Sequence, residues 1–116
     1  MSRDLQRLTQ SLRDFAQERD WEQFHSPKNL ASALSVEAAE LLEHFQWLTE
    51  EQSRHLTDQK KAEVAAEAAD VLLYLLQLCD KLDIDLIEAA QRKLVVNAEK
   101  YPAARAHGSS KKYTDL

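Results

Sequence analysis

The fold is decided by residues 58–82, which read DQKKAEVAAEAADVLLYLLQLCDKL. Apolar side chains recur in this stretch at helical spacing, at Val64, Val71, Leu75, Leu78 and Leu82. Helix-favouring residues also dominate the whole chain, since its 116 residues include 18 Leu and 16 Ala but only 7 Val and Ile together and one Gly. A multi-stranded sheet would need more β-branched residues and more glycine turns. The sequence therefore predicts an all-α protein.

Three further helices are expected around this one. The first runs from about Arg3 to Trp21, and the second from an N-cap at Ser26 to about Thr49, with Pro27 at its first position. The fourth begins after Asp85 and ends at Tyr101, because Pro102 cannot continue it. We therefore expect a four-helix bundle over residues 1–101, followed by a short C-terminal tail over residues 102–116.

Charge and apolar patterning exclude several classes of protein. Residues 34–70 contain nine acidic residues against three basic ones, and no long basic stripe is present to replace the counterions of duplex nucleic acid. No window approaches the roughly 18 apolar residues of a membrane span. A single cysteine and a charged, Leu-interleaved N-terminus without an apolar signal core favour a cytoplasmic protein.

The helix predicted from Asp58 is apolar around much of its circumference. Leu72, Leu73 and Leu76 lie away from the stripe formed by Val71 and Leu75. One apolar face would pack inside the subunit and another against a copy of the chain, so we expect a homodimer or a higher homo-oligomer.

Two similar acidic segments carry the strongest functional signal. V-E-A-A-E-L-L at 36–42 and A-E-A-A-D-V-L-L at 66–73 each place an acid, two alanines and a second acid beside the buried stripe. In an antiparallel hairpin the two segments would lie at the same height, so four carboxylates would converge. Such a cluster needs counter-charge, and its oxygen ligands suit Mg²⁺ or Mn²⁺. The converging acids are Glu37, Glu40, Glu67 and Asp70.

Acidic pairs of this kind also occur on solvated helix surfaces and in di-iron proteins. Acids three residues apart are common on solvated helices, but two pairs matched in angle and height favour a metal site. A di-iron site needs two E-x-x-H helices, and only Glu22 and His25 have that spacing.

Aromatic and basic residues accompany the acids. Trp47 and Tyr74 extend the acidic face, and Trp21 and His25 lie where the chain bends; their rings could frame a flat ligand or simply pack between subunits. Donors that suit phosphate oxygens form a stripe in the fourth helix. These donors are Lys93, Asn97 and Lys100.

The E-A-A-E and E-A-A-D segments resemble the E-x-x-E…E-x-x-D signature of the MazG-like all-α nucleoside triphosphate pyrophosphohydrolases. Further segments are similar to the dCTP pyrophosphatase branch of that family, and the resemblance covers nearly the whole chain. These segments are E-R-D-W-E-Q-F-H (18–25), F-Q-W (45–47), N-x-x-K-Y-P (97–102) and the terminal S-S-K-K-Y-T-D-L.

The resemblance implies a MazG-like four-helix bundle that hydrolyses dCTP, or cytosine-modified dCTP, between the α and β phosphates with Mg²⁺. It implies that the four acids bind metal and act in catalysis, and that the oligomer is a tetramer built from dimers. A nucleoside pocket is implied for Trp21, His25, Trp47 and Tyr74, and phosphate binding for Lys93 and Asn97. Two alternatives stay open: a housekeeping hydrolase of other non-canonical nucleotides or dUTP, and a non-catalytic helical assembly module.

Overall fold

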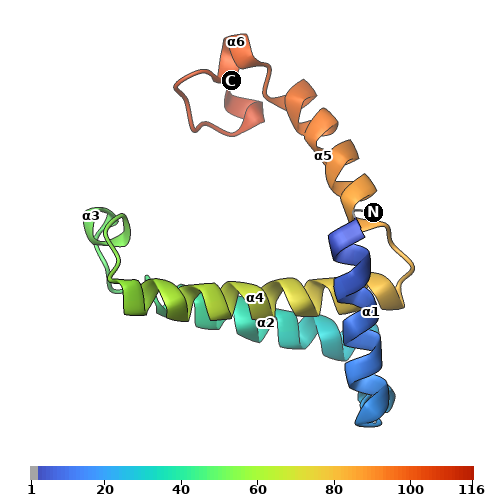
Figure 1. Cartoon of the computed structure of the whole chain (residues 1–116). Helices are drawn as coiled ribbons and strands as arrows, with labels where there is room; N and C mark the ends of the chain where they lie inside the picture. The colour runs from blue at the N-terminus through green and yellow to red at the C-terminus, as the bar shows by residue number, and fades with distance from the viewer. Residues whose placement is uncertain (1–2) are drawn as a thin grey trace. The chain divides into compact units, whose positions relative to one another are not determined.

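The computed structural model describes residues 3–116, and every regular element within them is helical (Figure 1). The prediction of an all-α protein is therefore confirmed. The elements, in chain order, are α1 (Arg3–Glu18), η1 (Glu22–Phe24), α2 (Pro27–Glu43), α3 (Glu50–Ser53), α4 (Asp58–Lys81), α5 (Leu86–Lys100), α6 (Ala103–Ala106) and η2 (Tyr113–Asp115), where η denotes a 3₁₀-helix.

The chain divides into two compact units between Ile84 and Asp85. The first unit contains α1 to α4 and the second contains α5, α6 and η2. The boundary expected at residue 101, between a helical domain and a tail, stays a prediction.

The first unit is built on a hairpin of its two longest helices. α2 and α4 lie side by side and run in opposite directions, with α3 in the connection between them (Figure 1). Each of the two helices begins after a side-chain cap: Ser26 accepts a hydrogen bond from the amide of Asn29, and Thr57 accepts one from the amide of Lys60. The antiparallel hairpin that the acidic segments require is therefore present.

The second helix ends earlier than predicted. It was expected to reach about Thr49, but α2 stops at Glu43, residues 44–47 form turns and Leu48 is a bend. The reason lies in the next element, because Thr49 is the N-cap of α3 and forms a capping box with Gln52. A capping residue adopts an extended backbone, here φ −73° and ψ 164°, so the helix must end before it.

Two aspartates end helices in a conformation that usually requires glycine. Asp20 follows α1 with φ 54° and Asp83 follows α4 with φ 55°. After each aspartate an amide bonds back five residues, from Trp21 to Ala16 and from Ile84 to Cys79, which is the pattern of a Schellman cap. Aspartate tolerates the left-handed region better than most residues, so it serves here in a chain with one glycine.

α1 is fixed to α4 by a paired ion contact and by its buried residues. The guanidinium of Arg13 donates two hydrogen bonds to the carboxylate of Asp80, one of them from Nε to Oδ2 at 2.8 Å. Thr9 and Ala16 are buried on α1, and Leu76 and Cys79 are buried on α4. The position of α1 on α4 matters because α1 supplies one wall of the cavity described below.

The second unit folds its tail back on itself. Tyr113 packs edge-on against Tyr101 with ring centroids 5.9 Å apart, and Nζ of Lys100 lies 5.0 Å from the Tyr113 centroid. Arg105 donates a hydrogen bond to the carbonyl oxygen of Leu116 at 2.7 Å. The terminal segment is therefore held against the C-terminal end of α5.

Across residues 3–116, no helix has the length and apolar character that a membrane crossing requires.

The Arg13–Asp80 pair predicts a pH dependence of stability. Hydrogen bonds from Arg13, followed by its positive charge, hold the pKa of Asp80 below its ordinary value. A carboxyl group with a depressed pKa stabilises the fold above its unfolded pKa, and this stabilisation is lost as the pH falls through the folded pKa. Because Arg13 is about half exposed, the contribution is about 1 kcal/mol or less.

Urea unfolding at about pH 7 and about pH 3 measures this effect. We expect the wild-type chain to lose more stability on acidification than Asp80→Asn, while Asp83→Asn, a change on an exposed residue three positions away, behaves like the wild type. Equal losses in wild type and Asp80→Asn would contradict the assignment.

Candidate functional site

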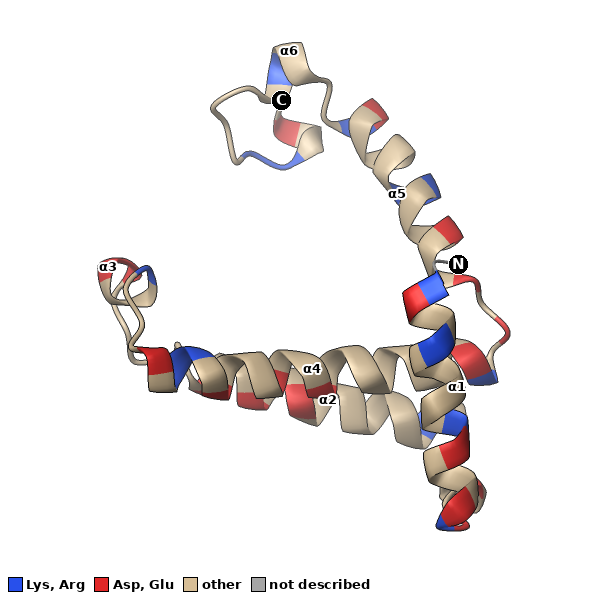
Figure 2. Cartoon of the chain, viewed as in Figure 1, with Lys and Arg blue, Asp and Glu red and all other residues tan. Residues whose placement is uncertain are grey.

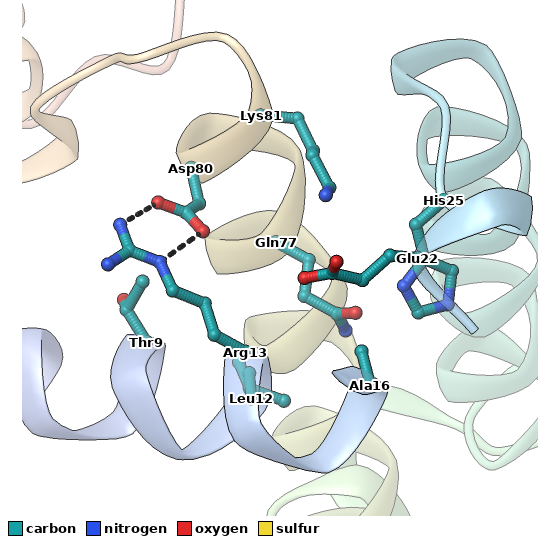
Figure 3. Close-up of a pocket in the computed structure, with 9 residues that line it drawn as sticks. All are labelled: Thr9, Leu12, Arg13, Ala16, Glu22, His25, Gln77, Asp80 and Lys81. Carbon is teal, nitrogen blue, oxygen red and sulfur yellow. Dashed lines mark hydrogen bonds and ion pairs between the residues drawn. The ribbon is translucent and has the colours of Figure 1, made fainter. Parts of the chain in front are cut away.

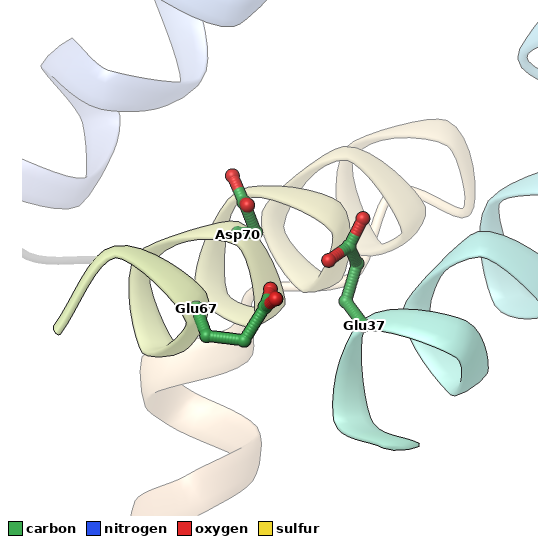
Figure 4. A group of neighbouring side chains, drawn as sticks. All are labelled: Glu37, Glu67 and Asp70. Atoms are coloured by element: carbon green, nitrogen blue, oxygen red, sulfur yellow. The ribbon is translucent and has the colours of Figure 1, made fainter. Parts of the chain in front are cut away.

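Three carboxylates meet on the facing sides of the hairpin. Glu37 projects from α2, and Glu67 and Asp70 project from α4 one turn apart (Figure 4). One oxygen from each group lies within 4.8 Å of one oxygen from each of the others. Figure 2 shows that acidic residues gather along the middle of α2 and α4. The convergence predicted from the two acidic segments therefore occurs for these three residues.

The fourth predicted acid, Glu40, lies beside this trio but does not complete the group. Its charge and hydrogen-bonding capacity raise the pKa of both Glu37 and Glu67, so its carboxyl group is close to both. The four acids thus share one electrostatic site, with three of them close enough to share a single ion.

Crowding of the carboxylates raises their pKa values. The pKa of Glu37 rises to about 7, first because of the neighbouring Glu67 carboxyl, then because of Glu40 and partial burial. For Glu67, the interaction with Glu37 lowers the pKa, but burial and the charges of Glu40 and Asp70 outweigh it, so the pKa of Glu67 is also raised. Negative charges held together in this way favour a proton or a cation between them.

Two carboxylate oxygens at the centre of the group are buried without hydrogen bonds. These are Oε2 of Glu37 and Oε2 of Glu67, neither of which has a partner among residues 3–116. Buried polar atoms are ordinarily satisfied, so unpartnered acceptors at a cluster of anions call for a ligand. All the atoms that could bind a metal here are carboxylate oxygens, which fits a hard divalent cation such as Mg²⁺ or Mn²⁺.

A cavity of ≈ 420 Å³ opens beside the acids, between α1, the η1 connection and α4. Asp70 belongs both to the carboxylate group and to the cavity wall, so the two features form one site. Most of the wall surface is apolar, although about half of the lining residues carry a polar group, and this combination is typical of a small-molecule site. Its lining residues are Leu8, Ser11, Leu12, Phe15, Trp21, His25, Asp70, Leu73, Tyr74 and Gln77.

Three of the four predicted nucleoside-binding residues line this cavity. They are Trp21, His25 and Tyr74. Trp47 does not line it: because α2 ends at Glu43, the helical position assigned to Trp47 does not apply, and Trp47 is 87% exposed in a turn. A role for Trp47 therefore stays a prediction that this cavity does not account for.

Lys93 and Asn97 lie one turn apart and exposed on α5, in the second compact unit. Their phosphate-binding role stays a prediction from the family resemblance.

The α1 wall of the cavity was not recognised as functional from the sequence. Leu8, Leu12 and Phe15 form the apolar stripe of the first helix, a pattern that ordinarily indicates core. In the structure Phe15 is instead about half exposed and packs edge-on against Trp21, with ring centroids 5.7 Å apart. The only signal in the sequence was the proximity of this stripe to the W-E-Q-F-H segment.

A second, much smaller cavity of ≈ 20 Å³ adjoins the same elements (Figure 3). It is ringed by the Arg13–Asp80 pair and by Glu22, His25 and Gln77. Its volume is on the scale of a single water molecule. Leu12, His25 and Gln77 line both cavities and so form part of the partition between them.

Comparison with known proteins agrees with this geometry. Residues 32–116 match the MazG-like family. The chain belongs to the MazG-like family. This assignment confirms the family resemblance drawn from the acidic segments.

Several relatives of this MazG-like chain carry informative names. Proteins called dCTP pyrophosphatase 1 from Homo sapiens and Bos taurus are 44% and 42% identical to it over 105 residues, which are 89% of this chain and 62% of theirs. The chain thus spans about three fifths of the length of these curated relatives. The crystal structure of a pyrophosphatase from Archaeoglobus fulgidus is 45% identical, with a TM-score of 0.82 over 88% of this chain and 95% of that one.

Removing one of the crowded carboxylates should stabilise the metal-free chain but reduce the stabilisation that a divalent cation gives. Without metal, Glu67→Gln should raise the melting temperature above pH 7, because it removes a charge from a repelling group. Added Mg²⁺ should raise the melting temperature of the wild type, since it binds the folded site, and should raise that of Glu67→Gln much less.

Thermal unfolding with EDTA and with Mg²⁺ tests this expectation. Glu43→Gln is the matched control, because Glu43 is exposed at the end of α2 and is not one of the clustered acids. The metal-free wild type should also lose stability as the pH rises through about 7, the pKa of Glu37. Equal Mg²⁺ responses of wild type and Glu67→Gln would contradict the site.

Proposed function

We propose that this chain is a Mg²⁺-dependent pyrophosphohydrolase that cleaves dCTP, or cytosine-modified dCTP, between the α and β phosphates to give dCMP and pyrophosphate. It would act on the cytoplasmic nucleotide pool. The observation that carries the proposal is the direct continuity, through Asp70, between the group of clustered carboxylates and an aromatic-lined cavity.

The names of the relatives support the same substrate class. Curated proteins 42–44% identical to this chain are named for dCTP and pyrophosphate chemistry, and a similar solved structure is described as a pyrophosphatase. Identity at this level over most of the chain, together with the acids in place, favours the same reaction here.

Mg²⁺ bound at the site would neutralise charge on the triphosphate and lower the pKa of a bound water. The residues that would hold it are Glu37, Glu67 and Asp70, with Glu40 beside them. α2 and α4 fix the positions of these carboxylates before any ligand binds, so little reorganisation is required when a triphosphate arrives. The helices would therefore hold the four carboxylates in place at the point where the negatively charged triphosphate binds.

The cavity next to the acids would hold the nucleoside. Trp21, Phe15 and Tyr74 offer ring surfaces to a flat base, and Leu12 and Leu73 exclude water from it. Because Asp70 lies at the junction of acids and cavity, a bound nucleotide would place its phosphates toward the carboxylates and its base toward α1.

A homo-oligomer, a tetramer or a dimer, is part of the proposal. Large apolar residues remain exposed on several helices of the single chain, among them Leu42 on α2 (60%) and Leu94 on α5 (68%). Among residues 3–116 the fully buried large side chains are only Leu30 and Leu76. Surfaces of this kind are typical of subunit interfaces.

Removing single acids should abolish hydrolysis without unfolding the chain. We expect Asp70→Asn and Glu40→Gln each to lower the kcat for dCTP at least about 100-fold, since each takes away charge that holds the cation. Pyrophosphate release should require Mg²⁺, and orthophosphate should not appear. Glu43→Gln should retain wild-type turnover.

Circular dichroism on the same samples would show that helicity is retained. Normal turnover in both acid variants would exclude these residues from the site, and a chain that hydrolyses no triphosphate would favour a non-catalytic assembly module. Equal turnover of dCTP and dUTP would keep the reaction and remove the cytosine preference.

The two tryptophans should differ in effect if the cavity is the nucleoside site. Trp21→Leu should raise the KM for dCTP about 10-fold or more, because a stacking surface is lost. Trp47→Leu should change KM little if Trp47 acts only as the exposed turn residue seen in the single chain. A large effect of Trp47→Leu with none of Trp21→Leu would place the base elsewhere.

A further inference from the structure

One polar side chain of the cavity differs from the others in having a fixed orientation. Gln77 lines the cavity from α4 and is partly buried. Its amide nitrogen Nε2 donates a hydrogen bond to the backbone carbonyl of Leu73 at 3.2 Å. A rotation of the amide by half a turn would set its oxygen against that carbonyl oxygen, so the hydrogen bond keeps Nε2 at Leu73. The amide therefore presents Oε1 as an acceptor and the second N–H of Nε2 as a donor, in a fixed order.

Gln77 lies at the right distance from the acids to meet the base of a nucleotide. Asp70, Tyr74 and Gln77 follow one another along the same face of α4, and all three line the cavity. Seven residues of helix place Gln77 about 10 Å from Asp70 along the axis. This span is comparable to the length of a nucleoside, so with the phosphates at the acids the edge of the base falls near Gln77. That placement of the phosphates rests on the proposed function.

The hydrogen-bonding edge of cytosine matches the fixed amide, and that of uracil does not. Cytosine carries an exocyclic amino group, a donor, beside a ring nitrogen that accepts. Uracil has an oxygen acceptor in place of the amino group and a ring N–H donor beside it. Oε1 of Gln77 can accept from the cytosine amino group while the second N–H of Nε2 donates to the cytosine ring nitrogen. In the same position uracil would set its oxygen against Oε1 and its ring N–H against the N–H of Nε2.

The other polar groups near the base do not make this distinction. The hydroxyls of Ser11 and Tyr74 can rotate to donate or to accept, and the imidazole of His25 can carry its proton on either nitrogen. These residues can therefore satisfy cytosine and uracil alike, and the fixed amide of Gln77 is left to discriminate.

We propose that Gln77 is a specificity-determining residue that selects cytosine over uracil by accepting a hydrogen bond from the exocyclic amino group of the base. Figure 3 draws Gln77 from the side of the smaller cavity, where its side chain extends from α4 toward Glu22 and His25. Gln77 lines the larger cavity as well. The selection follows from the tie to Leu73, which belongs to the protein before any nucleotide is bound.

Binding of the monophosphates dCMP and dUMP tests the proposal without depending on hydrolysis. Calorimetric titrations of the full chain should show that the wild type binds dCMP about 10-fold or more tightly than dUMP. In Gln77→Met, which keeps the length of the side chain, the two affinities should become nearly equal through weaker dCMP binding. Gln59→Met, on an exposed residue of the same helix outside the cavity, should keep the wild-type ratio.

A second variant keeps the test decisive if Gln77→Met folds poorly. Gln77→Glu loses the hydrogen bond to Leu73, but an ionised carboxylate offers acceptor oxygens in every orientation, so this variant should still prefer dCMP over dUMP. The proposal is overturned if the wild type binds both nucleotides equally, if Gln77→Met keeps the preference, or if Gln77→Glu loses it.

Failure of the proposed function would look different. A wild type that prefers dCMP through Gln77 but releases no pyrophosphate from dCTP would retain the base selection and exclude the hydrolase. If the wild type releases pyrophosphate from dCTP but Gln77→Met leaves the ratio of dCMP and dUMP affinities unchanged, the hydrolase is retained and base selection by Gln77 is excluded.

Discussion

The repulsion between carboxylates on facing helices is the constraint on which the rest of this structure depends. The packing of the hairpin holds three carboxylates together, although their charges oppose it. One oxygen from each of Glu37 on α2 and Glu67 and Asp70 on α4 lies within 4.8 Å of the others. Without a bound cation or proton, the stability of the surrounding helices must offset this repulsion. The capped starts of α2 and α4 and the Schellman end of α4 stabilise the two helices that carry these acids. The proposed function depends on it, because a preformed group of anions would bind a divalent cation and through it a polyphosphate.

Much of this arrangement could be predicted from the sequence, because its causes are local or periodic. Helix positions follow from the 3.6-residue repeat and from caps such as Ser26, and the two acidic pairs follow from helical angle and matched height. The early end of α2 was missed because the capping box of Thr49 competes with helix continuation, and the polar connector gave no sign of a separate helical turn. That error also misplaced Trp47, whose assigned face exists only if the helix continues.

The cavity was harder to foresee, because it depends on which apolar side chains are left uncovered. The stripe of Leu8, Leu12 and Phe15 has the same pattern whether it faces a core or a ligand. What makes it a wall is the packing of α1 on α4, where Arg13 pairs with Asp80, a residue 67 positions away in the sequence. No spacing rule reveals such a contact. The orientation of the Gln77 amide could not be predicted from the sequence either, because it depends on one hydrogen bond to Leu73.

The most direct test of the account is to locate the cation itself. Crystals grown or soaked with Mn²⁺, which replaces Mg²⁺ in oxygen-ligand sites, would reveal it by anomalous scattering. The account predicts a strong anomalous peak bonded to carboxylate oxygens of Glu37, Glu67 and Asp70 and facing the cavity at Asp70. A well-diffracting, Mn²⁺-saturated crystal with no peak between these side chains, or with ordered Mn²⁺ only at acids elsewhere, would contradict it.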